Sequence, residues 1–194
     1  MEIKIIGNDV AYVGQGMAFP RVVEIRTTHE EQLPVGLTFT VEYTDESRRY
    51  VLKKVEIASS DLGHEINGQL IRSIQFQEML LKGLSRLKYF DLNAHEFSQV
   101  PALEYRPSKR DAIIKQGPTS KTLETVALLY RIAEVLNANQ GKHIEKALGI
   151  PYATAANWIS RARKHGAFES ISDLSQVFPS LKEDSLRFQA DSFV

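Results

Sequence analysis

The sequence predicts an α+β fold, in which an antiparallel sheet and one long helix come before an all-helical module. Two observations support this prediction. The first third of the chain contains short runs rich in β-branched residues, separated by residues that favour turns. From residue 121 onward, apolar residues recur only at helical spacing. Packing a helix on an antiparallel sheet gives the α+β arrangement.

Four runs near the start are predicted to be strands. They are Glu2–Ile6, Arg21–Thr28, Leu37–Tyr43 and Tyr50–Ile57. Glycine-, proline- or Asn/Asp/Ser-containing segments at 7–9, 14–16, 33–36 and 44–47 are predicted to be turns. The last of these turns is expected to close a hairpin between the third and fourth strands.

A single long helix is predicted to follow, from about Glu65 to Phe90. Apolar residues between Leu70 and Leu87 recur with helical periodicity. Gly83 disfavours a helix at this point, because an interior glycine costs about 1 kcal/mol relative to alanine. Much of the helix circumference is apolar, which favours packing in the core, with a dimer interface as the alternative.

The remaining chain is predicted to be helical, with a boundary near 105–118. The segments Tyr105–Asp111 and Gln116–Ser120 have the composition of connectors. Helices are expected at Thr122–Ala138, Lys142–Leu148 and Tyr152–His165. The expected division is an α+β domain of unknown role at 1–105, a connector at 106–120, a helical module at 121–168 and an acidic tail at 169–194.

Charge is distributed unevenly along a chain that is neutral as a whole. The 24 lysines and arginines balance the 24 carboxylates, which by itself does not favour a nucleic-acid partner. Between Asn139 and Phe168, however, five basic residues stand against Glu145 alone. The tail from Glu169 onward has five acidic and two basic residues. A basic module is therefore followed by an acidic tail.

Composition and motif content argue against several classes of function. The chain has 194 residues, is 43% hydrophobic and has no cysteine, as expected of a globular protein without disulfides or thiol chemistry. Neither a signal-peptide layout nor an apolar run of about 20 residues is present, so a cytoplasmic protein is expected. The histidine–acid neighbours lack metal-ligand spacing, and Gly14–Gly16 is not a dinucleotide fingerprint. No enzyme activity, cofactor or metal is expected.

The segment Gly141–Ser160 carries the most informative pattern. Ile144 and Leu148 lie one helical turn apart, and Gly149 follows where the chain must reverse tightly. In the next helix, one apolar stripe is formed by Ala155, Trp158, Ile159 and Ala162. This segment resembles the helix-turn-helix of bacterial and phage DNA-binding proteins, and in particular the C-terminal module of helix-turn-helix proteins from actinobacteria and phages. The N-terminal domain resembles no family known to us.

The resemblance implies a double-stranded DNA-binding protein whose second helix enters the major groove. Base contacts are expected from the face opposite the stripe, at Tyr152, Ala153, Ala156, Asn157 and Ser160. Phosphate contacts are expected from Lys142, His143, Arg161, Arg163 and Lys164. The sequence departs from the family pattern at Glu145, where a small residue is usual, and at Pro151, where a Ser or Thr cap is usual.

The function expected on this basis is that of a transcriptional regulator of phage or mobile-element origin. It is expected to form a homodimer, because such proteins commonly place two modules on two half-sites. A protein partner or effector could bind the N-terminal domain. The alternative is a protein-assembly factor that uses the helical module to bind a protein.

Overall fold

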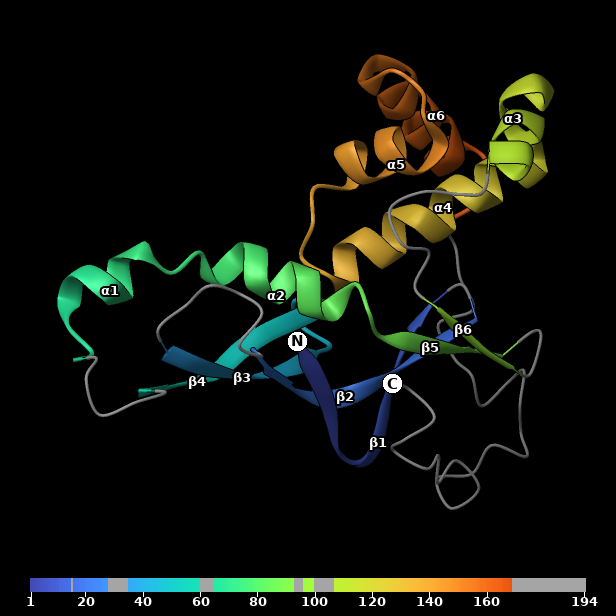
Figure 1. The fold of residues 1–194 in the computed structure, drawn as a ribbon. Coiled ribbons are helices and arrows are strands. Elements are labelled where there is room, and N and C mark those ends of the chain that lie inside the picture. Colours follow the sequence, from blue (N-terminus) through green and yellow to red (C-terminus); the bar gives the residue numbers. More distant parts are fainter. Residues whose placement is uncertain (15, 28–34, 60–64, 93–95, 100–106, 169–194) are drawn as a thin grey trace.

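A computed structural model describes residues 1–14, 16–27, 35–59, 65–92, 96–99 and 107–168 (Figure 1). Its strands are β1 (Glu2–Gly14), β2 (Met17–Arg26), β3 (Val35–Thr44), β4 (Arg49–Ser59), β5 (Lys88–Asp91) and β6 (Glu96–Gln99). Its helices are α1 (Gly68–Ser73), α2 (Phe76–Leu84), α3 (Pro107–Gln116), α4 (Ser120–Val135), α5 (Gln140–Leu148) and α6 (Tyr152–Lys164). The predicted acidic tail, 169–194, lies outside the described residues.

The described strands form one antiparallel sheet, which confirms the α+β class. The strand order is β4-β3-β2-β5-β6, and β1 also pairs with β2. Along β3 every second residue is buried, since Phe39 and Val41 face the core while Thr40 lies between them and is partly exposed. The predicted hairpin between β3 and β4 is confirmed by the pairing of Tyr43 with Tyr50.

The predicted turn at 7–9 is wrong, because the chain does not reverse there. It passes through an irregularity inside β1, where the pairing register shifts between Ile6 and Val10. Gly7 has a φ of 76°, a left-handed conformation that glycine adopts without steric cost. The chain reverses between Gly14 and Met17, which pair with each other, and this confirms the turn predicted at 14–16.

The single long helix predicted from Glu65 to Phe90 is also wrong. Two short helices, α1 and α2, lie in this range. Ile74 separates them, because its backbone is extended and its side chain is buried. The last residues form β5, which pairs with Met17 and Ala18 of β2. Because β3 pairs only with the other end of β2, from Val22 onward, this part of β2 is available to another strand. Strand pairing with a distant segment therefore decides the structure of Lys88–Asp91, in spite of the helical periodicity before it.

Gly83 allows helix α2 to approach the sheet closely. A Cβ atom at this position would lie 2.7 Å from the Ile25 side chain, closer than a real side chain could come. The glycine that disfavours a helix in isolation is thus required by the helix–sheet contact. At the start of α1, the Asn67 side chain accepts hydrogen bonds from the N–H groups of Gln69 and Leu70, as a helix cap does.

The range 106–120, predicted as a connector, contains helix α3. Pro107 begins this helix, a position that suits proline because the first N–H of a helix needs no partner within it. Ile113 is buried in the apolar cluster of the helical module. The segment therefore belongs structurally to that module.

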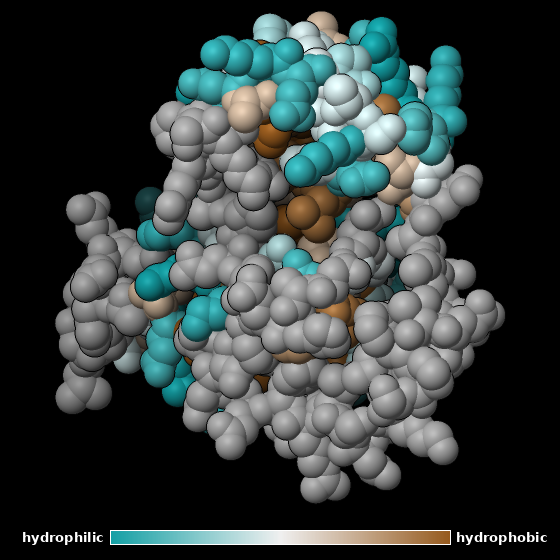
Figure 2. Space-filling view, turned by 90° about the vertical axis from the view of Figure 1, so that its right-hand side faces the viewer, coloured by the Kyte–Doolittle hydropathy of each residue, from teal (hydrophilic) through white to brown (hydrophobic). Residues whose placement is uncertain are grey.

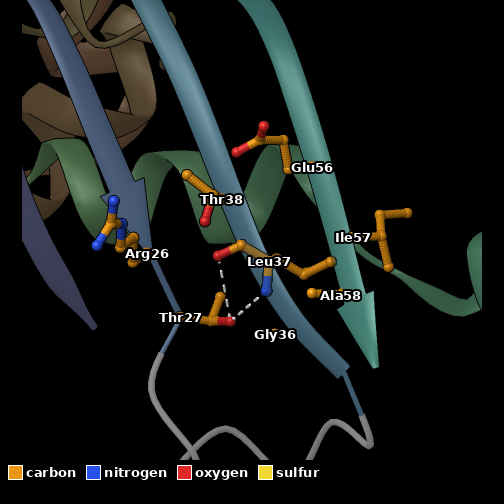
Figure 3. Close-up of a pocket in the computed structure, with 8 residues that line it drawn as sticks. All are labelled: Arg26, Thr27, Gly36, Leu37, Thr38, Glu56, Ile57 and Ala58. Carbon is orange, nitrogen blue, oxygen red and sulfur yellow. Dashed lines mark hydrogen bonds between the residues drawn. The ribbon is translucent and has the colours of Figure 1, made fainter. Parts of the chain in front are cut away.

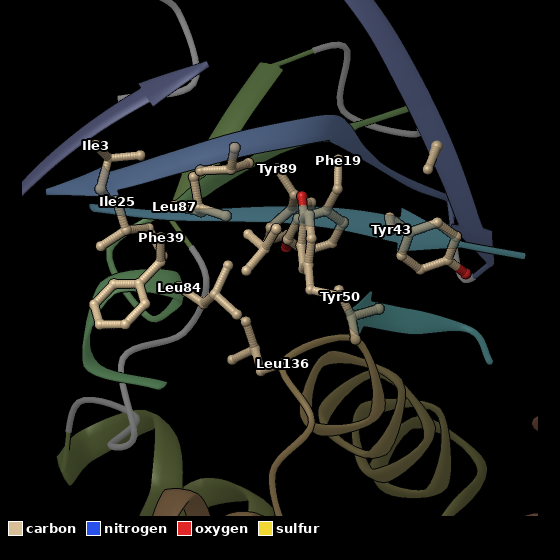
Figure 4. Packing of buried hydrophobic residues seen from close by; sticks show 14 of the residues in the cluster. Ile3, Phe19, Ile25, Phe39, Tyr43, Tyr50, Leu84, Leu87, Tyr89 and Leu136 are labelled. Atoms are coloured by element: carbon tan, nitrogen blue, oxygen red, sulfur yellow. The ribbon is translucent and has the colours of Figure 1, made fainter. Parts of the chain in front are cut away.

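Helix α4 belongs to both apolar cores. The part of α4 up to Leu129 contributes Leu123, Val126 and Leu129 to the cluster between the helices. Its last turn contributes Val135 to the sheet core, and Leu136 follows directly (Figure 4). Because one continuous helix is shared, the sheet and the helical module are mechanically linked.

Hydrogen bonds reinforce this link at the end of α4. Asn137 has a φ of 56°, and its side-chain Oδ1 accepts a hydrogen bond from Arg49 on β4. Its carbonyl accepts a bond from the Gln77 side chain on α2, at 3.4 Å. The junction between α4 and α5 is therefore tied to both the sheet and α2.

Candidate nucleic-acid interface

The first helix of the candidate interface, α5, is capped at both ends. The Asn139 side chain accepts a hydrogen bond of 2.9 Å from the Lys142 N–H at its start. At its end Gly149 adopts the left-handed conformation, with a φ of 64°. Ile144 and Leu148 are fully buried between these caps, as predicted.

The second helix, α6, begins at a sharp turn and buries one stripe. Pro151 precedes it and provides no side-chain cap, as predicted from its lack of an oxygen. Ala155, Trp158 and Ala162 are buried in the helical cluster, and Ile159 packs at its margin. Ile150, in the turn, is buried in the same cluster and fills the space between the two helices. The predicted stripe is confirmed.

The residues predicted to contact bases all lie on the exposed face of α6. They are Tyr152, Ala153, Ala156, Asn157 and Ser160. The Tyr152 side chain is 50% exposed and its ring packs over Gly141, where a Cβ would lie 2.6 Å from the ring. The centre of this face therefore consists of small or polar side chains, and one aromatic ring lies at its start.

The predicted phosphate-contacting residues divide into three groups. Lys142, Arg161 and Lys164 are exposed. Arg163 is exposed too, but its guanidinium donates a 3.0 Å hydrogen bond to the Tyr130 hydroxyl and lies 5.4 Å from the centre of that ring. Arg163 thus fastens α6 to α4, which reduces its freedom to reach a ligand. Hydrophilic side chains gather at this helical end of the molecule (Figure 2).

His143 does not fit the predicted phosphate-contact role. Its side chain lies in the interior of the module, and the residue is only 4% exposed. Burial, with the Lys146 ammonium as a smaller cause, lowers the pKa of His143 from 6.5 to about 4. A neutral, buried ring cannot pair with a phosphate, so we remove His143 from the candidate interface. His143 is buried because it lies next to Ile144 on the buried side of α5.

Glu145 is accommodated where the family pattern has a small residue. Its side chain is half-buried, and its backbone carbonyl accepts hydrogen bonds from the N–H groups of Gly149 and Ile150. These bonds belong to the turn itself, so they do not depend on the side chain at this position. A half-buried glutamate at this position is therefore compatible with the turn between α5 and α6.

One basic residue at this interface was missed by the sequence reasoning. Arg110, on α3, lies against the turn, because a Cβ on Gly149 would be 3.1 Å from its guanidinium. Two residues in the sequence favoured a helix here, namely Pro107, which suits a first helical turn, and the apolar Ile113.

The helical module as a whole is basic. Over residues 107–168 the sequence has ten lysines and arginines against four carboxylates. The rest of the chain therefore has more acidic than basic residues.

The described residues also form an open depression of about 540 Å³ at one end of β2, β3 and β4 (Figure 3). The charged groups at its rim are paired on the surface, Arg26 with Glu24 at 2.8 Å and Lys54 with Glu56 at 2.6 Å. The Thr27 hydroxyl accepts the Leu37 N–H. This arrangement contains no nucleophile next to a base, and we assign it no chemistry.

In the described part of the chain, no helix is both long and apolar enough to cross a membrane. No three histidine or acidic side chains there are grouped as metal ligands. Comparisons with models of protein families, with curated proteins and with solved structures found no match to this chain.

Proposed function

We propose that this protein binds double-stranded DNA sequence-selectively, with α6 in the major groove. The observation that carries the proposal is the division of α6 into two faces. Ala155, Trp158 and Ala162 hold one face against α4 and α5. The other face is exposed over the length of the helix. A major groove about 12 Å wide admits such a helix.

The side chains along the exposed face suit different parts of a duplex. Asn157 lies near the middle, and its amide can donate to and accept from the edge of an adenine. Arg161 and Lys164 follow one and two turns later, where they are placed for phosphates. Phosphate contacts provide affinity and register, whereas contacts with base edges provide sequence preference.

A transcriptional regulator of phage or mobile-element origin is the biological role we propose for this activity. One module with few cations offers limited affinity, so we also propose a homodimer that binds two half-sites about one DNA turn apart. The α+β part is proposed to supply dimerisation or to bind an effector. Its attachment through α4 gives it a direct connection to the helical module.

A second candidate function is binding of a protein partner by the helical module. Two exposed apolar side chains on this module favour it, Tyr152 at 50% and Ile114 at 40% exposure. Electrophoretic mobility shifts of duplex DNA at increasing salt distinguish the two functions. Electrostatic DNA binding weakens steeply as salt rises. A protein-binding module would have no affinity for duplex DNA at any salt concentration.

Selection of bound duplexes from a random pool tests sequence preference directly. For Asn157→Ala we expect a relaxed preference at one position of the selected site, by about 1–3 kcal/mol for a lost bidentate contact. Affinity for unrelated duplexes should stay nearly unchanged. Arg161→Ala should instead weaken binding to all sequences alike and flatten the salt dependence by about one unit. Unaltered site preference in Asn157→Ala would contradict the assignment of α6 as the reading helix.

A further inference from the structure

We infer that Arg110 of α3 is a further DNA-contacting residue, which binds a phosphate beside the N-terminal end of α6. This inference rests on the proposed DNA binding and extends the interface beyond the helix-turn-helix itself. Arg110 comes from a helix that precedes the motif by more than two dozen residues. Its side chain nevertheless lies against the turn between α5 and α6.

Two properties of Gly149 allow the Arg110 side chain to lie against the turn. Gly149 has a positive φ, which favours glycine for backbone reasons alone. It also lacks the Cβ atom that would lie 3.1 Å from both the Cδ and the Nη1 of Arg110. Helix α3 packs against α5, and Ile113 anchors α3 in the helical cluster. The guanidinium is thus held next to the segment that leads into α6.

The charge of Arg110 remains accessible to a ligand. Its side chain is 35% exposed, and the carboxylate of Asp111 lies 3.8 Å from its Nε, a distance at the outer limit of an ion pair. Asp111 is itself 61% exposed, so solvent screens this pair. Arginine can bind a phosphate through two parallel N–H groups, which would leave the contact with the turn in place.

Cations lie near both ends of α6. At 1.5 Å per residue, Arg161 and Lys164 lie roughly 14 and 18 Å along the axis from the first residue of α6. Arg110 lies at the opposite end, beside the turn. With α6 in the major groove, cations near both ends of the helix would be placed for phosphates at two positions along the duplex.

The salt dependence of duplex binding by Arg110→Gln tests this inference. We expect affinity to fall several-fold for every sequence, and the slope of log affinity against log salt to flatten by about one unit. Lys115→Gln is the matched control, because it removes the same charge from the same helix. Lys115 is exposed and lies about 140° around the helix from Arg110. It should leave the slope unchanged.

Arg110→Lys separates a charge effect from a packing effect. It keeps the positive charge, so it should restore most of the salt slope even if thermal unfolding shows a loss of packing against Gly149. An unchanged slope in Arg110→Gln would overturn the inference, as would an equal flattening in Lys115→Gln. If the unaltered protein shows no salt-dependent binding of duplex DNA, the proposed function fails and this inference fails with it.

Discussion

Replacing Trp158 with alanine is expected to melt the helical module. The tryptophan is 7% exposed and belongs to the apolar cluster that α6 forms with α4 and α5. Truncating a buried aromatic side chain costs about 3–5 kcal/mol, because apolar contacts are lost and a cavity remains. A small bundle has little stability to spare. Loss of helical circular dichroism at a lower temperature or denaturant concentration measures the effect.

The shared helix α4 determines how far this unfolding spreads. Amide hydrogen exchange should rise throughout α5 and α6 in Trp158→Ala. Protection in β2 and β3 should survive, since their cores contain Phe19 and Phe39 from the sheet itself. The last turn of α4 should show an intermediate loss, because Val135 is anchored in the sheet core.

Tyr152→Ala is the matched control, since it removes another aromatic ring from α6. That ring is half exposed, so the free energy of unfolding should fall much less. Equal losses in the two variants would contradict the burial assignment. So would a fully solvent-exposed fluorescence spectrum of the native protein, which has a single tryptophan.

Acid is expected to destabilise the fold through His143. In the folded protein burial holds its pKa near 4, whereas in the unfolded chain it returns to about 6.5. Below pH 6.5 the unfolded state therefore binds a proton that the folded state excludes. Protonation of His143 in the unfolded state should lower the free energy of unfolding by about 3 kcal/mol between pH 6.5 and pH 4. Above pH 7 the group should have no effect on the free energy of unfolding.

Chemical denaturation at several pH values checks this prediction. His143→Leu replaces the ring with an apolar group of similar size, so its stability should fall less between pH 6.5 and pH 4 than that of the unaltered protein. His165→Leu is the control, because its ring is exposed and its removal leaves His143 in place. Identical pH profiles for the unaltered protein and His143→Leu would show that the ring is not excluded from water.

Local patterns were sufficient to predict the elements whose periodicity and packing agree. The alternation in Leu37–Tyr43 predicted a strand with one buried side, which β3 confirms. The i, i+3, i+4, i+7 spacing that begins at Ala155 predicted the buried stripe of α6. Gly149 marked the tight turn, because few other residues adopt its backbone conformation.

Prediction failed where a distant segment decided the outcome. The helix was predicted to continue to Phe90, but Lys88–Asp91 forms a strand that pairs with Met17 and Ala18 on the side of β2 that β3 leaves free. The strand therefore depends on a partner far away in the chain, which single-sequence patterns do not contain. The error at His143 has a local origin instead, because this residue shares the buried side of α5 with Ile144, Ala147 and Leu148 and was assigned to a phosphate from its charge chemistry alone.

The sequence by itself determined the α+β class, the tight turn at Gly149 and the buried and exposed faces of α6, because each follows from short-range spacing and backbone preference. Only the tertiary structure decided that α4 serves two cores and that Arg110 lies beside Gly149. Those features arise when segments separated along the chain bury apolar surface together. The hydrophobic effect has no preferred direction, so an apolar stripe gains free energy by packing against any other apolar surface. Which two surfaces pack together is therefore decided only in the folded molecule.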